Sequence, residues 1–366
     1  AGAYFTVIAN PSLKWETQIS TDIALEFGLF DRLTGTIEYF KKDSKDLLFD
    51  VSQPASVGVT SIIQNIGKVT NSGVEIELDY NAFKNKDWSV SVGANATFVK
   101  NKIKNLPATM KENGYISGSK KWLEGKSIYE FWLRQWHGVD PQTGDGLYVA
   151  DVSKYNQGNI GTGDGNITQS QFDEYKKTVV TIDGKELTNS YTYAKYDFSG
   201  SSIPDVFGGF NVRVSYKNFD LAAVFSYQLG GQVLDTNYAT MMSMTEFGYA
   251  QSPDLLKAWK QAWDITEVPR IDNSAAHTTN IGQSYSTRWL TSSDYLNLRS
   301  VTIGYQFPKA WLSKVMLKSA RLNLTAENLF MLKARQGLNP MANYSGVTYN
   351  EYMPSRNITL GLNVSF

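Results

Sequence analysis

The sequence predicts an all-β protein, a transmembrane antiparallel β-barrel, and three observations support this fold class. Apolar and polar residues alternate over long stretches, as in "ITLGLNVSF" at 358–366. Turns of a few residues alternate with much longer connections, and aromatic residues cluster beside the short turns. Successive side chains of a strand point to opposite faces, so each alternating stretch has one apolar and one polar face.

Four hairpins are expected, each made of two alternating stretches joined by a short turn. The paired stretches are 19–29 with 33–39, 74–80 with 88–98, 210–216 with 219–229, and 300–307 with 320–328. The C-terminal stretch adds a further strand. Together with weaker stretches such as "GLYVAD" at 146–151, about eleven strands are predicted.

The connections between these strands are unequal in length. The long ones are predicted at 50–67, 105–123, 151–204, 236–291 and 333–352. Outer-membrane barrels have short periplasmic turns and long extracellular loops. Counting back from the C-terminal strand places every short turn on one side, provided that 146–151 is a strand. The aromatic residues beside the short turns then form one girdle at the membrane boundary: Phe27, Phe30, Trp88, Tyr216, Phe219, Tyr305 and Phe307.

The length of the strands decides which way the apolar face points. A soluble β-sandwich buries that face against a second sheet and typically has strands of about 5 or 6 residues. The stretches found here are longer, as membrane strands are, so we expect the apolar face to meet lipid. The charged residues of the opposite face would line a wet interior: Glu75, Glu77, Asp79, Arg213, Arg321 and Glu327.

Composition excludes several classes of protein. The 366 residues include no cysteine, so disulfides and thiolate metal sites are excluded, and the balance of 35 basic and 35 acidic residues does not point to nucleic acid. The chain has no run of about 18 apolar residues that could form a membrane helix. The start, "AGAYFTVIAN", has no signal-peptide features. Either the chain is cytoplasmic or its beginning is missing.

We expect no catalytic residue, no cofactor and no metal site. The carboxylates of Glu75, Glu77 and Asp79 lie on one face of one strand, where a solvated pore wall explains them better than catalysis. The two histidines, His137 and His277, are far apart in the sequence.

A calcium loop at 161–168, "GTGDGNIT", is the alternative to the absence of metal. If Gly165 takes the place of the glycine of such a loop, residues that are poor calcium ligands occupy the ligand positions. These residues are Ile160, Thr162 and Gln171. A turn-rich surface loop is the better interpretation.

Several motifs resemble one family. They are "NPSLKWET" at 10–17, "RLTGTIEYFKKDSKDLL" at 32–48, "NIGKVTNSGVEIEL" at 65–78, "GVDPQTG" at 138–144, "FGGF" and "YKNFDL" within 207–221, "DYLNLRSVTIGYQFP" at 294–308, "ENLF" at 327–330 and "YMPSR" at 352–356. From about residue 10 to the end, the sequence resembles the SusC/RagA-type TonB-dependent transporters of Bacteroidota. It departs from them at "GLNPM", 337–341, where the family usually has an acidic pair around the proline.

The resemblance implies a larger outer-membrane protein. Residues 1–366 would be the C-terminal half of a 22-stranded plugged barrel, and the plug, the TonB box and the first barrel half would precede Ala1. The complete transporter would import glycans or oligopeptides together with a SusD-like surface lipoprotein, driven by TonB, ExbB and ExbD through the missing N-terminal region. Its other partners would be that N-terminal part itself and outer-membrane lipid. An all-β surface carbohydrate-binding module without transport is the alternative.

Two segments carry site hypotheses. The C-terminal strand resembles the signal read by the outer-membrane insertion machinery, with Leu360, Leu362, Val364 and Phe366 as its apolar positions. In the segment 252–265, Ser252 and Pro253 predict the start of a helix. Such a helix would align Leu256, Trp259 and Trp263 in one stripe, which would pack on neighbouring loops or contact the lipoprotein or substrate.

Overall fold

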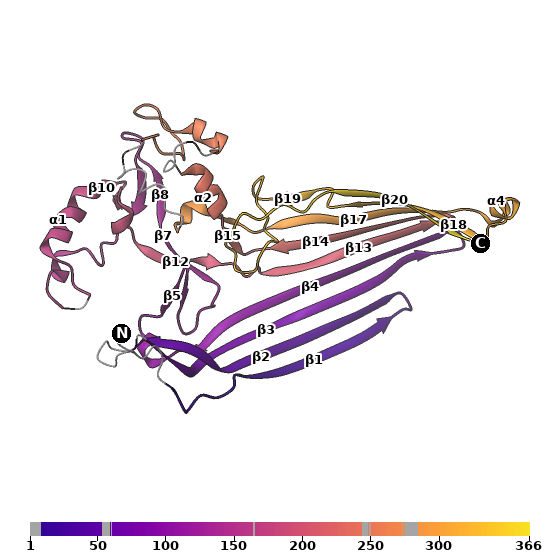
Figure 1. Ribbon diagram of the computed structural model, residues 1–366, viewed down its shortest axis with the longest axis horizontal. Helices are drawn as coiled ribbons and strands as arrows, with labels where there is room; N and C mark the ends of the chain where they lie inside the picture. Colours follow the sequence, from indigo (N-terminus) through magenta and orange to yellow (C-terminus); the bar gives the residue numbers. More distant parts are fainter. Residues whose placement is uncertain are drawn as a thin grey trace, which may run out of the picture.

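One large antiparallel sheet dominates the molecule (Figure 1). The computed structural model describes residues 9–52, 59, 61–163, 165–243, 248, 250–272, 274 and 285–366. Ten strands form this barrel sheet, in the order β1-β2-β3-β4-β13-β14-β17-β18-β20, with β19 also paired to β17. The strands are β1 (Thr17–Leu29), β2 (Leu33–Ser52), β3 (Ser61–Lys84), β4 (Trp88–Asn105), β13 (Val206–Tyr216), β14 (Phe219–Leu229), β17 (Tyr295–Gln306), β18 (Ser319–Glu327), β19 (Met331–Lys333) and β20 (Asn357–Ser365).

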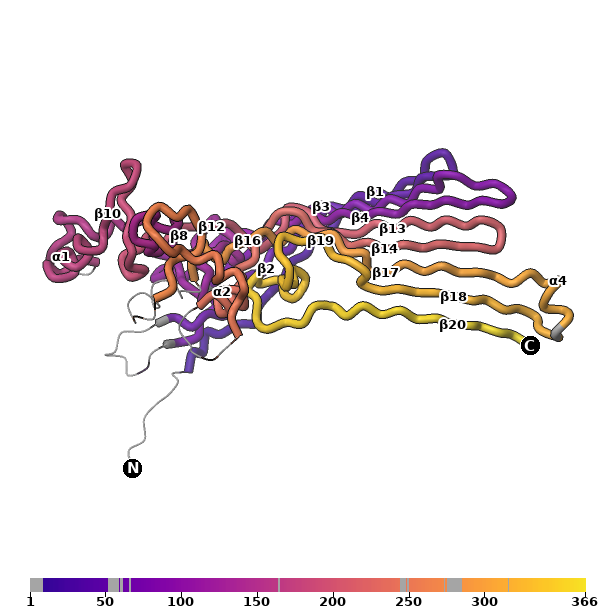
Figure 2. Tube along the Cα trace, turned by 90° about the horizontal axis from the view of Figure 1, so that it is seen from above, coloured from indigo at the N-terminus to yellow at the C-terminus, as the bar shows by residue number. Residues whose placement is uncertain are grey.

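The four predicted hairpins are confirmed. They are β1 with β2, β3 with β4, β13 with β14, and β17 with β18. Their turns lie at one end of the sheet with the C-terminus, at the right of Figure 1, and we call this the turn end. The last turn contains α4 (Lys309–Leu312) and η7 (Ser313–Val315). The long connections gather at the opposite end, the loop end, and Figure 2 shows the strands spreading from β1 to β20 as an open sheet.

The segment between β4 and β13 differs from the prediction. The stretch 146–151 does form a strand, β9 (Gly146–Val149), but β9 pairs with β8 and β11 at the loop end and does not join the barrel sheet. The predicted loops 105–123 and 151–204 are therefore parts of one excursion, from residue 106 to 205. Counting strands back from the C-terminus could not reveal this error. Adding or removing two strands leaves every short turn on the same side of the membrane. The predicted connection 50–67 is shorter as well, because β2 and β3 pair as far as Ser52 and Ser61.

Smaller elements build the loop end. One four-stranded sheet contains β5 (Tyr115–Ser117), β6 (Lys120–Trp122), β7 (Glu130–Arg134) and β12 (Tyr196–Ser201). A second contains β8 (Trp136–Val139), β9, β10 (Val179–Ile182) and β11 (Lys185–Thr188), and β15 (Gln232–Leu234) pairs with β16 (Leu290–Ser292). The helices here are η2 (Ala108–Met110), η3 (Gln157–Asn159), α1 (Gln169–Thr178), η4 (Tyr191–Tyr193), α2 (Thr236–Met242), η5 (Pro253–Lys257) and η6 (Thr287–Trp289). No helix in the described part of the chain is long and apolar enough to span a membrane.

The helix α1 explains the end of the glycine-rich stretch 161–168. The Thr168 hydroxyl accepts a hydrogen bond from the Gln171 backbone N–H, and the Thr168 N–H donates to the Gln171 side chain. This capping box begins a helix, so Gln171 serves as a cap at the position where a calcium loop would need a ligand. Among the described residues, no group of three or more His, Asp or Glu is placed to hold a metal ion.

The buried apolar cores lie at the loop end or beside it. The largest surrounds Phe131, Leu133, Leu234 and Trp289, a second surrounds Tyr155, Tyr175 and Tyr193, and a third surrounds Ile103 and Leu106. The apolar face of the barrel sheet, in contrast, is widely exposed. A β-sandwich would bury that face, whereas a membrane barrel presents it to lipid.

Candidate functional site

The polar face of the barrel sheet brings together residues that are far apart in the sequence. Strand register places Asp79 opposite Gly93, and Gly93 opposite Asn211, so all three belong to one face. A Cβ added to Gly93 would lie 2.6 Å from both the Asp79 Oδ1 and the Asn211 Nδ2 atoms. The glycine therefore leaves the space over which these two polar side chains approach each other.

An ion pair lies on the same face nearer the turn end. The Arg321 Nη2 atom is 2.6 Å from the Asp220 Oδ2 atom, and the Arg321 Nε–H donates to Asn323 Oδ1 at 2.7 Å. The pair crosses Gly304, which lies opposite both Asp220 and Asn323. Both charges are partly exposed, so the pair adds little stability. Its effect is to fix the positions of charges on the inner wall.

The part of the polar face on β1 to β3 is acidic. A hollow of about 530 Å³ is lined there by Glu26, Glu77, Asp79, Thr34 and Thr36, with no basic residue among its lining residues. The predicted wall residue Glu75 lies two positions from Glu77 and shares this face. The register also places Arg213 and Glu327 on the polar face, opposite Ser91 and Ser300. All six predicted wall residues therefore lie on the polar face.

The opposite, apolar face has the dimensions of a membrane-spanning surface. At the turn end, Trp88 and Tyr216 lie with ring centroids 4.3 Å apart, and Phe219 and Tyr305 lie 4.5 Å apart, so neighbouring rings of the predicted girdle are in contact. Phe98 lies ten residues beyond Trp88 on the same face of β4. At about 3.4 Å per residue and a tilt of about 40°, the two rings are about 26 Å apart along the membrane normal, which matches the apolar band of a membrane barrel.

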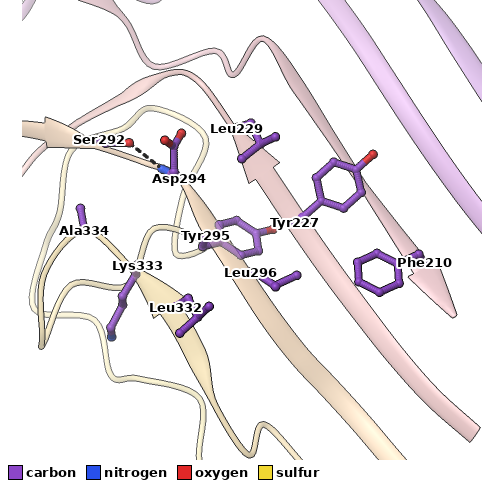
Figure 3. A pocket seen from close by; sticks show the side chains of 10 residues that line it. All are labelled: Phe210, Tyr227, Leu229, Ser292, Asp294, Tyr295, Leu296, Leu332, Lys333 and Ala334. Atoms are coloured by element: carbon purple, nitrogen blue, oxygen red, sulfur yellow. Dashed lines mark hydrogen bonds between the residues drawn. The ribbon is translucent and has the colours of Figure 1, made fainter. Parts of the chain in front are cut away.

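A hollow of about 610 Å³ interrupts this apolar face where β19 replaces β18 beside β17. Figure 3 shows its lining, in which Phe210, Tyr227, Leu229, Leu296 and Leu332 provide the apolar surface. Phe210 also stacks on Phe225, with centroids 4.5 Å apart. These five apolar residues share the face that carries the apolar band, so the apolar lining of the hollow belongs to the lipid-facing surface.

A buried ion pair fastens two connections at the loop end. Asp235 is 3% exposed, its Oδ1 accepts hydrogen bonds from the Tyr238 N–H and the Thr348 hydroxyl, and its Oδ2 pairs with the Arg335 guanidinium. The guanidinium lies 3.6 Å from the centroid of the Tyr238 ring. Backbone hydrogen bonds between Leu234 and the 346–348 segment continue the contact. These interactions hold the connection 334–356 against α2, and sequence spacing gave no indication of them.

The segment 252–265 follows the prediction only at its start. The Ser252 hydroxyl accepts from the Asp254 N–H, and Pro253 is the first helical residue. The helix prediction is wrong beyond Lys257, because η5 is a single 3-10 turn. The Asp264 carboxylate accepts from the backbone N–H groups of residues 260 and 261, which turns the chain back.

The predicted stripe therefore does not form. Trp259 is half-buried and donates its Nε1–H to the Pro141 carbonyl at 3.0 Å, whereas Leu256 is 78% exposed and Trp263 is 70% exposed. Trp263 has a φ of +74°, outside any helix. Trp259 thus packs on a neighbouring connection, and the two exposed side chains remain candidates for contact with a partner.

The structure also shows where the C-terminal apolar residues and one of the two histidines lie. Leu360, Leu362, Val364 and Phe366 are exposed along and just beyond β20, the edge strand of the sheet, so the strand is confirmed while the assembly role stays a prediction. His137 is exposed on β8, and His277 lies outside the described residues.

Sequence reasoning missed a stack of aromatic and basic side chains on β7 and β12. Trp132 lies 4.9 Å from Phe198 and 6.2 Å from Tyr196. Basic groups cover the rings: Lys121 on Trp132 at 4.1 Å, Lys126 on Phe198 at 4.6 Å, and Arg134 on Tyr196 at 4.5 Å. The alternation of Trp132 and Arg134 with the buried Phe131 and Leu133 is the one sequence signal that could have indicated it.

A buried lysine at the loop end gives a pH prediction. Lys120 is 9% exposed, donates to the Tyr129 carbonyl and lies 3.1 Å from the Phe131 ring centroid. Burial lowers its pKa from 10.5 to about 7. Between these values the unfolded chain binds more protons than the folded one, so the lysine makes the free energy of unfolding rise from about pH 7 towards pH 10.

Lys120→Met should remove this rise from the pH dependence of the denaturation midpoint of the complete protein. Lys121→Met, at the half-buried neighbour, should keep it. Identical slopes for the wild type and Lys120→Met would contradict the assignment.

Comparisons with known proteins agree with the β-barrel fold. Residues 1–166 match the family model described as TonB dependent receptor-like, beta-barrel. TonB-dependent receptor P3 of Formosa agariphila is 29% identical over 384 residues, which cover 100% of this chain and 36% of that receptor. TonB-dependent receptor SusC of Bacteroides thetaiotaomicron is 25% identical, over 98% of this chain and 32% of its own length.

Solved structures of the RagAB peptide transporter share the fold. One superposes with a TM-score of 0.77 at 24% identity and covers 100% of this chain and 37% of that one. The RagAB peptide importer in its closed-closed state gives a TM-score of 0.77 at 25% identity, over 99% of this chain and 36% of that one. The sheet resembles a wall of the TonB-dependent barrels of SusC and RagAB. This barrel wall belongs to the outer membrane, and the chain spans about a third of the length of these relatives.

The likeness to these outer-membrane barrels also gives the direction of the wall. In outer-membrane barrels the short turns face the periplasm and the long loops face outside. The turn end of this sheet is therefore periplasmic, and the two small sheets with their apolar cores lie on the cell surface.

Proposed function

We propose that the complete protein to which this chain belongs imports glycans, oligosaccharides or oligopeptides across the outer membrane by TonB-dependent transport. The observation that carries the proposal is the combination of a charged inner wall with a folded extracellular end. A wall of this kind admits polar solutes, and long surface loops provide contacts that select among them. The relatives named SusC and RagAB support the same class of activity.

The chain would contribute the barrel wall and the surface loops, and the plug would come from another part of the protein. Substrate held by the loops and inner wall would change the contacts made by the plug, and this would signal to TonB, with ExbB and ExbD, in the periplasm. A SusD-like lipoprotein would cap the extracellular end. Leu256 and Trp263 are exposed there, and tryptophan is enriched among the residues that dominate binding at protein interfaces.

Uptake measurements test the proposal. Cells that carry the complete transporter would be given two fluorescent probes, a mixture of maltooligosaccharides and a mixture of casein-derived oligopeptides. Uptake of at least one probe should require both the transporter and TonB. Binding of either probe without uptake, unaffected by loss of TonB, would instead favour a surface carbohydrate-binding or peptide-binding protein.

A further inference from the structure

Lysines gather on the lipid-facing side of β2 to β4, just beyond the apolar band. Strand register places Lys41, Ser72 and Lys100 in one row across the three strands. The next row towards the loop end contains Asp43, Thr70 and Lys102. Residues opposite one another in a sheet share a face, so these rows continue the face that carries Tyr39, Val74 and Phe98. Lys45 and Lys68 lie opposite each other in the following row. We call Lys41, Lys45, Lys68, Lys100 and Lys102 the lysine belt.

The height of the belt corresponds to the membrane surface. Phe98 marks the outer edge of the apolar band, and Lys100 and Lys102 follow it by two and four residues on β4. With a rise of about 3.4 Å per residue and a tilt of about 40°, these two side chains originate about 5 and 10 Å beyond the band. This is the depth at which the charged groups of the lipids lie.

The charge of the belt is only partly neutralised within the protein. Asp43 accepts a hydrogen bond from the Thr70 hydroxyl and lies 3.4 Å from Lys41 and 3.9 Å from Lys68. Lys100 and Lys102 are exposed, and in the described part of the chain neither has a carboxylate within 4 Å. Two lysines beside the membrane are thus free to bind an anion.

A hollow of about 550 Å³ adjoins these lysines. Tyr39 and Phe98 give it an apolar floor, and Lys100, Lys102 and Lys126 give it basic walls. Glu130 and Asp205 also line it, near the loop end. Lys126 lies 4.6 Å from the Phe198 ring centroid, so the aromatic and basic stack of β7 and β12 begins next to the hollow.

We propose that this hollow binds a phosphate-bearing glycolipid of the outer leaflet. Acyl chains would lie along Tyr39 and Phe98, continuous with the lipid-facing band. A phosphate would lie between Lys100 and Lys102, since basic pockets at the membrane surface hold anionic head groups. The sugar part would extend towards the aromatic stack. The site does not depend on which solute is imported.

The test measures glycolipid binding to the intact transporter. Native mass spectrometry in detergent would follow binding of diphosphoryl lipid A to the wild type and to the double variant Lys100→Gln/Lys102→Gln. Each lysine at a membrane surface contributes about 1 kcal/mol, so losing both should weaken binding by about 30-fold. Lys100→Arg/Lys102→Arg keeps the charge and should bind nearly as the wild type does.

Matched controls separate this site from a general charge effect. Lys42→Gln/Lys86→Gln removes the same charge from the polar face of β2 and from a periplasmic turn, and should leave lipid A binding unchanged. An equal loss in this control, or no loss in the Lys100→Gln/Lys102→Gln variant, would overturn the proposal. So would equally tight binding of phosphatidylcholine, or displacement of lipid A by millimolar inorganic phosphate, which would indicate a site for free anions.

Discussion

Leu78→Arg is expected to reduce the amount of barrel inserted in the outer membrane, whereas Glu77→Arg, at the neighbouring residue, should leave it nearly unchanged. The Leu78 side chain is on the apolar face, 36% exposed, and lies over Gly35 beside Phe27. Strand register pairs it with Ala94, which lies between Trp88 and Phe98 on β4 and so within the apolar band, where an arginine near the midplane costs about 2–4 kcal/mol. Glu77 lies at the same depth on the polar face, in the acidic hollow with Glu26 and Asp79.

The two variants introduce the same side chain into one strand at adjacent positions, so the new arginine lies at the same depth on opposite faces. Their levels in outer-membrane fractions and their denaturant midpoints after folding into lipid would give the comparison. If both variants lost the same amount, the assignment of the two faces would be wrong. Other residues of the polar face are less suitable as controls. The Asn95 side chain, for example, accepts a hydrogen bond from the Gly209 N–H at 2.8 Å, so its replacement would remove that bond too.

The barrel strands could be predicted because two local rules agree there. Alternation with a period of two continues over many residues, and each pair of strands is joined by a short turn, as at 217–218 between β13 and β14. A one-residue error would move every apolar side chain to the wrong face. Long strands with one face in lipid therefore specify their own register, and the sequence shows it.

The loop end could not be predicted in the same way. Its strands have 3 to 6 residues, too few for alternation to distinguish a strand that crosses the membrane from one that does not. β9 illustrates the problem, since it was correctly predicted as a strand but assigned to the wrong sheet. Its pairing with β8 and β11 depends on contacts between distant segments, which no single stretch of sequence encodes.

For the site hypotheses, too, local interactions could be predicted and contacts between distant residues could not. Ser252 and Pro253 located the start of η5 because capping is a local interaction. The end of η5 depends on the Asp264 side chain, which accepts hydrogen bonds from two backbone N–H groups, and that competition was not visible in the helical spacing. The pairing of Asp235 with Arg335 joins residues far apart in the chain and has no local signal.

Asp235→Ala should destabilise the extracellular end of the barrel by about 3 kcal/mol or more. Removing one partner of a buried ion pair leaves the other charge without compensation and typically costs about 3–5 kcal/mol. Asp235 also caps α2 through the Tyr238 N–H, and loss of a cap costs about 1 kcal/mol. Because Arg335 keeps some contact with solvent, the lower part of the range applies to the pair. Limited proteolysis should then cut the connection 334–356 faster, and thermal unfolding should begin earlier.

A second variant separates the ion pair from simple loss of packing. Asp235→Leu/Arg335→Met replaces both charges by apolar side chains, and such replacements are often neutral or stabilising, so this variant should recover most of the resistance to proteolysis. Lys195→Met breaks an ion pair of 2.7 Å whose two side chains are exposed, and it should cost less than about 1 kcal/mol. If Asp235→Ala and Lys195→Met had equally small effects, Asp235 and Arg335 would not fasten the connection 334–356 to α2. The restraint on this connection would then come from the backbone hydrogen bonds between Leu234 and the 346–348 segment.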